Sequence, residues 1–410
     1  MKHTFTLLAL CVATALSAQT FTTWTTADGL PSNDLRDVAV DAAGNIWLAS
    51  QFGVVRFDGS TFTVHNTTSH PGLAADGILA IAVAANGEVW AGTDFGVSVF
   101  DGSNYTTYTT ADGLSDDQIT NIKQAPNGDV WIGTINGATL YRNSTFTAYG
   151  SPNIPFGGVT HIAFASNGDV WLSGGLGGVI VYNGSTFSTL TTANGLLSNR
   201  VRSIAFDGGD KWVATSKGIS TFDALDQHTG DHTRPFILPP PDTLNPVTDI
   251  ALDSHGVVWA AVYVDYLVTE GGVCAYDGNA WVQYETADGL AGPNVRRLAI
   301  DANDDVWVTT STGLTRISGF QIGIAENVND AGFALYPNPV VDQLDVVMEN
   351  GTTALTSIRV FDAGMRMVLT DNVLGSRSTA VRTSLDVSSL EAGVYFLQVG
   401  RGTRKFVIAR

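Results

Sequence analysis

The sequence predicts an all-β protein: a seven-bladed β-propeller followed by a small immunoglobulin-like β-sandwich. Seven of its nine tryptophans recur at intervals of 40 to 48 residues. Runs of Thr, Val, Ile and aromatic residues are broken by Asn-Gly, Asp-Gly and Gly-Gly, which is typical of strands joined by tight turns. Four-stranded units of about 40–45 residues repeated around an axis form propeller blades.

Each unit has the same internal order: an apolar pair three residues apart, a turn, the Trp, and then a glycine. Unit three reads Ile119/Ile122, Asn127-Gly128, Trp131 and Gly137. This order predicts four short strands per unit. The repeating tryptophans are Trp47, Trp90, Trp131, Trp171, Trp212, Trp259 and Trp307.

The two ends of the repeat region predict how the ring closes. The last unit stops near Ser318 without a clear fourth strand, whereas residues 20–24 match the fourth strand of other units. We expect this N-terminal strand to complete the seventh blade, which would leave the ring without a free edge.

The N-terminus predicts export. Lys2 precedes an apolar run from Phe5 to Leu16, and small residues follow, as in a signal peptide cleaved after Ala18 or Ala15. The run is too short to span a membrane, and we expect no transmembrane helix. The expected segments are a signal peptide over 1–18, the propeller over 19–320, a linker over 321–332 and a C-terminal domain over 333–410.

Charge indicates which classes of partner the protein avoids, and cysteine content indicates whether it contains a disulfide. Residues 20–320 carry 12 Lys and Arg against 30 Asp and Glu, an acidic surface that repels nucleic acid and anionic membranes. Only Cys274 remains after the signal peptide, so no internal disulfide is expected, and its neighbours indicate a small strand residue. We expect a monomer without cofactors.

One candidate site is a ring of polar residues on the innermost strands, each just before the second apolar residue of its unit. Such a ring near the central channel could bind a ligand or host acid–base chemistry, with His161 as the acid or base. Alternatively, these groups pair across blades and with channel water. The ring residues are Asp37, Asn121, His161, Ser203, Asp249 and Arg297, with Ala80 as the exception.

A second candidate site is the face that carries the loops between second and third strands. Phe52 and Phe95 lie on these loops, and an insertion in unit six adds Tyr263 and Tyr266. Exposed aromatic residues there suit contact with sugar rings or protein. The alternative is that Phe52 and Phe95 fold inward as contacts between blades.

No catalytic motif or paired-Cys metal set is present. Residues 301–305 faintly resemble a calcium loop but lack its glycine and distal Glu, which favours an ordinary turn. His228 and His232 lie four residues apart in an expected loop between third and fourth strands. They could form a metal site, but a solvated loop is the favoured interpretation. We predict no metal site.

The repeat resembles the two-component regulator propeller family. The resemblance rests on Asp28-Gly29-Leu30, Gly44-Asn45-Ile46-Trp47 and Gly53-Val54-Val55, and it recurs over residues 20–320. Members often form the sensing region of membrane histidine kinases that respond to glycans. The chain has no kinase and no spanning helix, so the resemblance implies no receptor role.

The C-terminal domain is similar to the type A sorting domain of the type IX secretion system of Bacteroidota. The shared motifs are Tyr336-Pro337-Asn338-Pro339, Val360-Phe361-Asp362, Leu385-Asp386-Val387-Ser388, Gly393-Val394-Tyr395 and Lys405-Phe406-Val407. The resemblance implies that 333–410 engages the secretion machinery, passes the outer membrane from the periplasm and is then removed, often with attachment to surface lipopolysaccharide.

The expected function is therefore a secreted or cell-surface propeller that binds a glycan or protein without catalysis. One alternative is a lyase or hydrolase at the channel mouth that uses His161, Asp37, Asp249 and Arg297. Another is a structural accessory of secretion or surface attachment.

Overall fold

A computed structural model gives the structure of the chain. It describes residues 19–154, 158–236, 245–264, 270–278, 280–319, 333–337, 340–348, 355–362, 367–374, 381–399 and 402–409. The expected signal peptide and linker lie outside these residues. No helix in the described part is long and apolar enough to cross a membrane.

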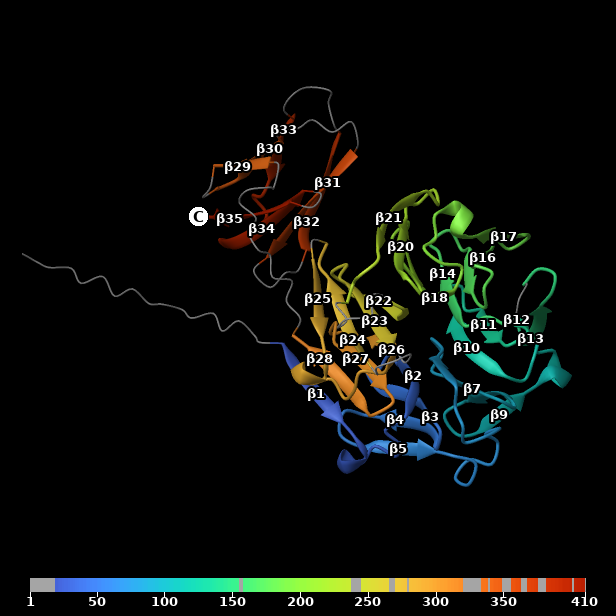
Figure 1. The fold of residues 1–410 in the computed structure, drawn as a ribbon. Helices are drawn as coiled ribbons and strands as arrows, with labels where there is room; N and C mark the ends of the chain where they lie inside the picture. The colour runs from blue at the N-terminus through green and yellow to red at the C-terminus, as the bar shows by residue number, and fades with distance from the viewer. Residues whose placement is uncertain are drawn as a thin grey trace, which may run out of the picture.

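Seven antiparallel four-stranded sheets follow one another around a ring (Figure 1). Blades 1 and 2 contain β2 (Leu35–Val40), β3 (Ile46–Ser50), β4 (Gly53–Phe57), β5 (Phe62–His65), β6 (Ala80–Val83), β7 (Val89–Thr93), β8 (Gly96–Phe100) and β9 (Tyr105–Tyr108). Blades 3 and 4 contain β10 (Ile119–Gln124), β11 (Val130–Thr134), β12 (Gly137–Arg142), β13 (Thr145–Tyr149), β14 (His161–Phe164), β15 (Val170–Ser173), β16 (Val179–Tyr182) and β17 (Phe187–Leu190).

The last three blades have the same order. Blades 5 and 6 contain β18 (Val201–Asp207), β19 (Asp210–Thr215), β20 (Gly218–Phe222), β21 (His228–His232), β22 (Val247–Leu252), β23 (Val258–Val264), β24 (Glu270–Tyr276) and β25 (Trp281–Tyr284). Blade 7 contains β26 (Val295–Ile300), β27 (Val306–Thr310), β28 (Leu314–Ser318) and β1 (Thr20–Trp24).

The N-terminal strand closes the ring as its sequence predicts. β1 pairs antiparallel with β28 in a register that runs from Thr20 opposite Ser318 to Trp24 opposite Leu314. Trp24 also stacks on Trp307 of the same blade, with ring centroids 5.5 Å apart. The first strand in sequence is thus the outermost strand of the last blade.

The Asp-Gly-Leu motif forms the connection from one blade to the next. Asp28 accepts the backbone N–H of Thr25, which caps the 3-10 turn η1 (Thr26–Asp28), and Gly29 then takes a left-handed φ of +93°. Leu30 is buried directly afterwards. The same turn recurs as η2 (Thr110–Asp112), η3 (Thr192–Asn194) and η4 (Thr286–Asp288).

The repeating tryptophans lie on the second strands and pack against the next blade. Trp131 of blade 3 shares a core with Ile162, Val170 and Leu172 of blade 4. Six of the seven are buried, whereas Trp212 is half-buried. The Trp repeat is therefore the apolar layer between neighbouring blades.

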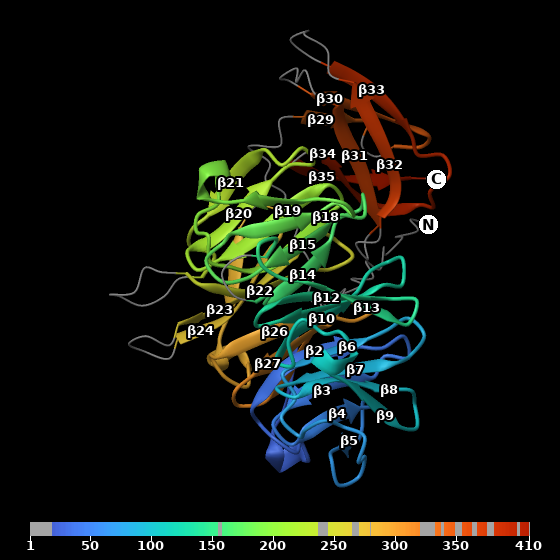
Figure 2. The ribbon, with the colours of Figure 1, turned by 90° about the vertical axis from the view of Figure 1, so that its right-hand side faces the viewer.

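Two sheets form the C-terminal domain, which is a separate body in Figures 1 and 2. One sheet contains β29 (Phe333–Tyr336), β30 (Gln343–Met348) and β33 (Val381–Asp386); the other contains β32 (Met367–Leu374), β31 (Leu355–Asp362), β34 (Gly393–Val399) and β35 (Gly402–Ile408). Leu344 and Val346 of the first sheet share a core with Val360 and Leu397 of the second. The domain is thus a β-sandwich.

Two segments differ from the sequence expectation. His228 and His232 bound strand β21, the outer strand of blade 5, rather than a loop. Tyr263 lies within β23 rather than in a loop, and it pairs with Gly271 of β24. The insertion in unit six therefore lengthens these two paired strands. Tyr266 lies outside the described residues.

Candidate functional site

The ring residues predicted from the sequence lie on the innermost strands, and a β-bulge precedes most of them. The register of the inner strand shifts directly before Asp37, Asn121, Ser203, Asp249 and Arg297. A bulge leaves backbone groups without ladder partners and turns the side chain that follows it. The ring is therefore a repeated backbone feature of the blades.

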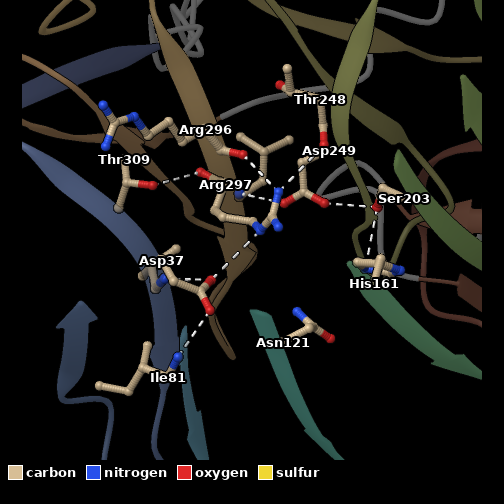
Figure 3. A network of polar contacts seen from close by, with 12 residues as sticks. Asp37, Ile81, Asn121, His161, Ser203, Thr248, Asp249, Arg296, Arg297 and Thr309 are labelled. Atoms are coloured by element: carbon tan, nitrogen blue, oxygen red, sulfur yellow. Dashed lines mark hydrogen bonds and ion pairs between the residues drawn. The ribbon is translucent and has the colours of Figure 1, made fainter. Parts of the chain in front are cut away.

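Four ring side chains accept a backbone N–H from the next blade. Asp37 accepts from Ile81 at 3.0 Å, Asn121 from Ile162 at 3.1 Å, Ser203 from Ile250 at 3.2 Å and Asp249 from Leu298 at 2.9 Å. The donor is always the second apolar residue of the following blade. These contacts join the inner strands of neighbouring blades, and Figure 3 shows the one between Asp37 and Ile81.

The contact between blades is different where blade 7 meets blade 1, because the Arg297 side chain has no acceptor atom for the backbone N–H of the next blade. The N–H of Val38 instead bonds to its own neighbour Asp37 at 2.9 Å. The Arg297 guanidinium approaches the Asp37 carboxylate at 3.9 Å and donates to the carbonyl of Arg296 at 3.2 Å. Burial raises the pKa of Asp37, and Arg297 opposes that shift.

His161 sits beside Ser203, which links it to Asp249. The Ser203 hydroxyl donates to Asp249 at 2.7 Å and lies 3.3 Å from His161 Nε2. Burial lowers the pKa of His161 to about 3, although Asp249 opposes that shift. The imidazole is therefore neutral near pH 7, so it has no extra proton to give as a general acid and is a weak base.

The channel below the ring forms a cavity of about 690 Å³. All four candidate catalytic residues line it: Asp37, His161, Asp249 and Arg297. It opens toward the turns between first and second strands, where Asp41 and Gln124 contribute polar atoms. The structure thus brings the four together, but the carboxylates of Asp37 and Asp249 are taken up by contacts between blades.

A second cavity of about 700 Å³ lies at the other end of the ring axis, where the inner strands begin. Five arginines line it, and none of its lining residues in the described part of the chain is Asp or Glu. We call this set the arginine mouth: Arg36, Arg200, Arg202, Arg296 and Arg297. Tyr263 also lines the cavity, so one of the predicted binding residues belongs to it.

Large apolar side chains are exposed on the same face, at the tips of the connections between second and third strands. Phe52 is 52% exposed and Phe95 is 66% exposed, so neither folds inward between blades. Ile135 and Leu176 occupy the matching loops of blades 3 and 4 at 40% and 68% exposure. We call these four residues the apolar rim.

Backbone hydrogen bonds place the apolar rim beside the blade-to-blade connections. Gly96 N–H donates to the carbonyl of Asp117, and Ile135 N–H donates to that of Gln118. Both acceptors lie between η2 and β10. The rim and the 3-10 turns therefore share one face of the propeller.

The carboxylates and histidines considered for metal binding make internal contacts. Asp301 accepts from the N–H of Asn303 and from Trp307 Nε1 at 2.9 Å, as a turn residue does. His228 pairs with Asp231, whereas the ring of His232 stacks on Trp212. Among the described residues, no three His, Cys, Asp or Glu side chains are grouped to hold a metal ion.

The arginine mouth is the feature that sequence reasoning missed. A signal was present, because Arg36, Arg202 and Arg296 all directly follow the first apolar residue of their units. An alternating strand would place that position on the opposite side from the ring residue. The bulge between them instead brings Arg296 and Arg297 to the same cavity.

Comparison with known proteins agrees with both domains. Residues 334–409 match the family model of the secretion system C-terminal sorting domain, and residues 113–136 match that of the two component regulator propeller. The second match covers β10 and β11 of blade 3. No curated protein matches the chain.

Several solved structures share the fold. PorZ, an essential bacterial surface component of the type-IX secretion system of Porphyromonas gingivalis, is 19% identical with a TM-score of 0.56, and the match covers 93% of this chain and 60% of PorZ. The extracellular domain of the hybrid two component system BT3049 of B. thetaiotaomicron is 16% identical with a TM-score of 0.61, covering 95% and 57%. A streptogramin B lyase is 13% identical with a TM-score of 0.56, covering 73% and 97%.

The chain thus spans about three fifths of the first two proteins, and these identities show the fold alone. The sorting-domain match implies export to the cell surface or release from the cell. The chain is thus a β-propeller protein with a match to the two component regulator propeller over residues 113–136 and a match to the secretion system C-terminal sorting domain over residues 334–409.

Proposed function

We propose that this exported propeller is a non-catalytic binding module whose ligand, a glycan or a protein, docks on the face bearing the apolar rim and Tyr263. The observation that carries the proposal is the repetition of exposure. Four successive blades present an exposed large apolar residue in the connection between their second and third strands. Apolar side chains gathered on one exposed face are typical of a docking surface.

The chemistry of this face suits sugar or protein contact. Aromatic rings offer apolar area for stacking on pyranose faces, and they lose little side-chain entropy on binding. The tips also carry polar groups: Asp94 accepts a hydrogen bond from Gln118, and Asn136 donates to Asp116. Such groups can direct hydroxyl groups of a ligand over the apolar contacts.

The channel supports the enzymatic alternative less well. The neutral His161 bonds to Ser203, and the carboxylates of Asp37 and Asp249 accept backbone donors from neighbouring blades. The likeness to PorZ and to a streptogramin B lyase rests on fold alone, so neither a secretion-accessory role nor lyase chemistry is carried over.

The test compares the rim with an exposed apolar residue elsewhere. The chain from residue 19 to 410 is screened on a glycan array and against purified extracellular proteins, as the parent, as Phe52→Ser/Phe95→Ser and as Leu225→Ser. Leu225 is 78% exposed on the connection between β20 and β21, on the opposite face, and serves as the matched control.

We expect the parent and Leu225→Ser to retain the same ligands and the rim variant to lose them. Equal retention by all three proteins would show that the rim is not the docking face. Melting curves of the three proteins should coincide, because both substitutions replace exposed side chains.

A further inference from the structure

The arginine mouth concentrates positive charge in a strongly acidic domain. Residues 20–320 carry 12 Lys and Arg, and five of them line this one cavity. They come from blades 1, 5 and 7 and from the connection that enters blade 5. Arginines from three separate parts of the sequence thus meet at one end of the axis.

Within the described residues, two carboxylates are recorded close to arginines of the mouth. Asp34 pairs with Arg296 at 2.8 Å, and Asp37 lies 3.9 Å from Arg297 beneath the mouth. Among the described residues, no acidic side chain lies within ion-pair distance of Arg36 or Arg200. Arg36 makes one long contact, 3.5 Å from its Nη1 to the carbonyl of Ile78.

Guanidinium groups held apart around a concavity bind oxyanions well. The planar fork of an arginine matches carboxylate, sulfate and phosphate oxygens in pairs. At physiological salt the acidic outer surface is screened beyond about 8 Å, so the local charge of the mouth decides binding at short range. A cavity of about 700 Å³ admits one or two sugar units rather than a folded protein surface.

We propose that the arginine mouth binds the negatively charged end of an acidic polysaccharide, one that carries carboxylate, sulfate or phosphate groups. The charged group enters the cavity between Arg36, Arg200 and Arg202, while Tyr263 and Leu176 contact the sugar ring. The adjacent apolar rim then holds the next sugars of the chain. The inference rests on the proposed function, because it names the ligand class of the same face.

The test measures binding of chosen oligosaccharides by calorimetry to the chain from residue 19 to 410. The probes are a chondroitin sulfate hexasaccharide, an oligogalacturonate, neutral maltohexaose and hexaglutamate. The test variant is Arg36→Gln/Arg200→Gln. Its matched control, Arg56→Gln/Arg142→Gln, removes the same charge from the opposite face, where Arg56 bonds to Asn45 and Arg142 pairs with Asp129.

We expect at least one acidic oligosaccharide to bind the parent and the control equally, and to bind the test variant at least tenfold more weakly. Affinity should also fall as salt rises from 50 to 300 mM, because charge contacts are screened. No binding of either acidic oligosaccharide, or equal loss in both double variants, would overturn the inference. Binding of hexaglutamate alone would also overturn it and would indicate an acidic protein ligand.

A neutral glycan provides the separate test of the proposed function. If maltohexaose binds and is lost in Phe52→Ser/Phe95→Ser but retained in Arg36→Gln/Arg200→Gln, the apolar rim is the docking face and the anionic ligand is wrong. If binding of the acidic oligosaccharide is lost in Arg36→Gln/Arg200→Gln but retained in Phe52→Ser/Phe95→Ser, the arginine mouth is a binding site and the apolar rim is not part of it.

Discussion

Replacing Asp249 tests whether the polar ring holds the blades together. Its carboxylate accepts the N–H of Leu298 from blade 7 and the hydroxyl of Ser203 from blade 5, and it is only 4% exposed. Asp249→Ala leaves both buried donors without this acceptor. A stranded buried donor costs about 1–3 kcal/mol.

The two lost contacts do not cost the same. The Ser203 hydroxyl can turn to His161 Nε2, which lies 3.3 Å away, whereas the Leu298 N–H donates to Asp249. We therefore expect Asp249→Ala to lower the free energy of unfolding by about 2–4 kcal/mol. Asp249→Asn keeps an acceptor oxygen and should cost less than about 1 kcal/mol, since Asn121 of blade 3 makes the same contact with Ile162 of blade 4.

Urea unfolding followed by tryptophan fluorescence measures both changes on the chain from residue 19 to 410. The free-energy difference follows from the shift of the midpoint at constant slope. An Asp249→Ala protein as stable as the parent would refute the cross-blade role of the ring. So would an Asp249→Asn protein as unstable as the alanine variant, because the acceptor would then not be what matters.

Three further predictions concern closure, pH and export. Deleting residues 19–24 removes β1 and exposes the edge of β28, so the melting temperature should fall and aggregation should rise in light scattering; an unchanged melting curve would contradict ring closure by β1. The folded-state pKa of His161, about 3, lies below its unfolded value near 6.5, so the unfolded chain protonates first and stability is lost as pH falls from 6.5 toward 3. His161→Asn should make the fall in unfolding free energy shallower by up to about 1.4 kcal/mol per pH unit in that range, and parallel curves for parent and variant would count against a buried neutral His161. Deleting residues 333–410 should trap the protein in the periplasm on cell fractionation, and normal appearance of the truncated protein outside the cell would contradict the sorting role of these residues.

The blades could be predicted from the sequence because their signals are local. A Trp in the second strand, a turn before it and a glycine after it recur in every unit, and each has one structural cause. Gly53, for example, has a φ of +129°, and a Cβ there would lie 2.2 Å from the carbonyl oxygen of His65. Even the pairing of β1 with β28 followed from counting strands per unit.

The candidate sites were harder to predict because they depend on backbone irregularities. The positions of the ring residues followed from the repeat, but their role as acceptors for the next blade depends on bulges that no residue pattern marks. The strand at His228–His232 was expected as a loop because its polar residues lack the alternation of a half-buried strand. Their strand conformation becomes evident only from the antiparallel pairing of β21 with β20.

The arginine mouth was missed because it assembles residues that lie far apart in the chain. Arg36 and Arg296 are 260 positions apart, yet β2 and β26 meet where the ring closes, and Arg296 Nη1 donates to the carbonyl of Leu35 at 3.3 Å. Placing the two arginines on one cavity requires both the closure and the register of the inner strands.

Parallel titrations on the two ends of the ring axis test most directly whether this propeller binds or catalyses. An oligosaccharide retained on the glycan array is titrated into the parent, Phe52→Ser/Phe95→Ser, Tyr263→Ala and His161→Ala, and its mass is followed for cleavage. The structure predicts weaker binding in the Phe and Tyr variants, unchanged binding in His161→Ala and an intact ligand throughout. Loss of activity only in His161→Ala, with cleavage of the ligand by the parent, would contradict the binding-module account and place the function in the channel.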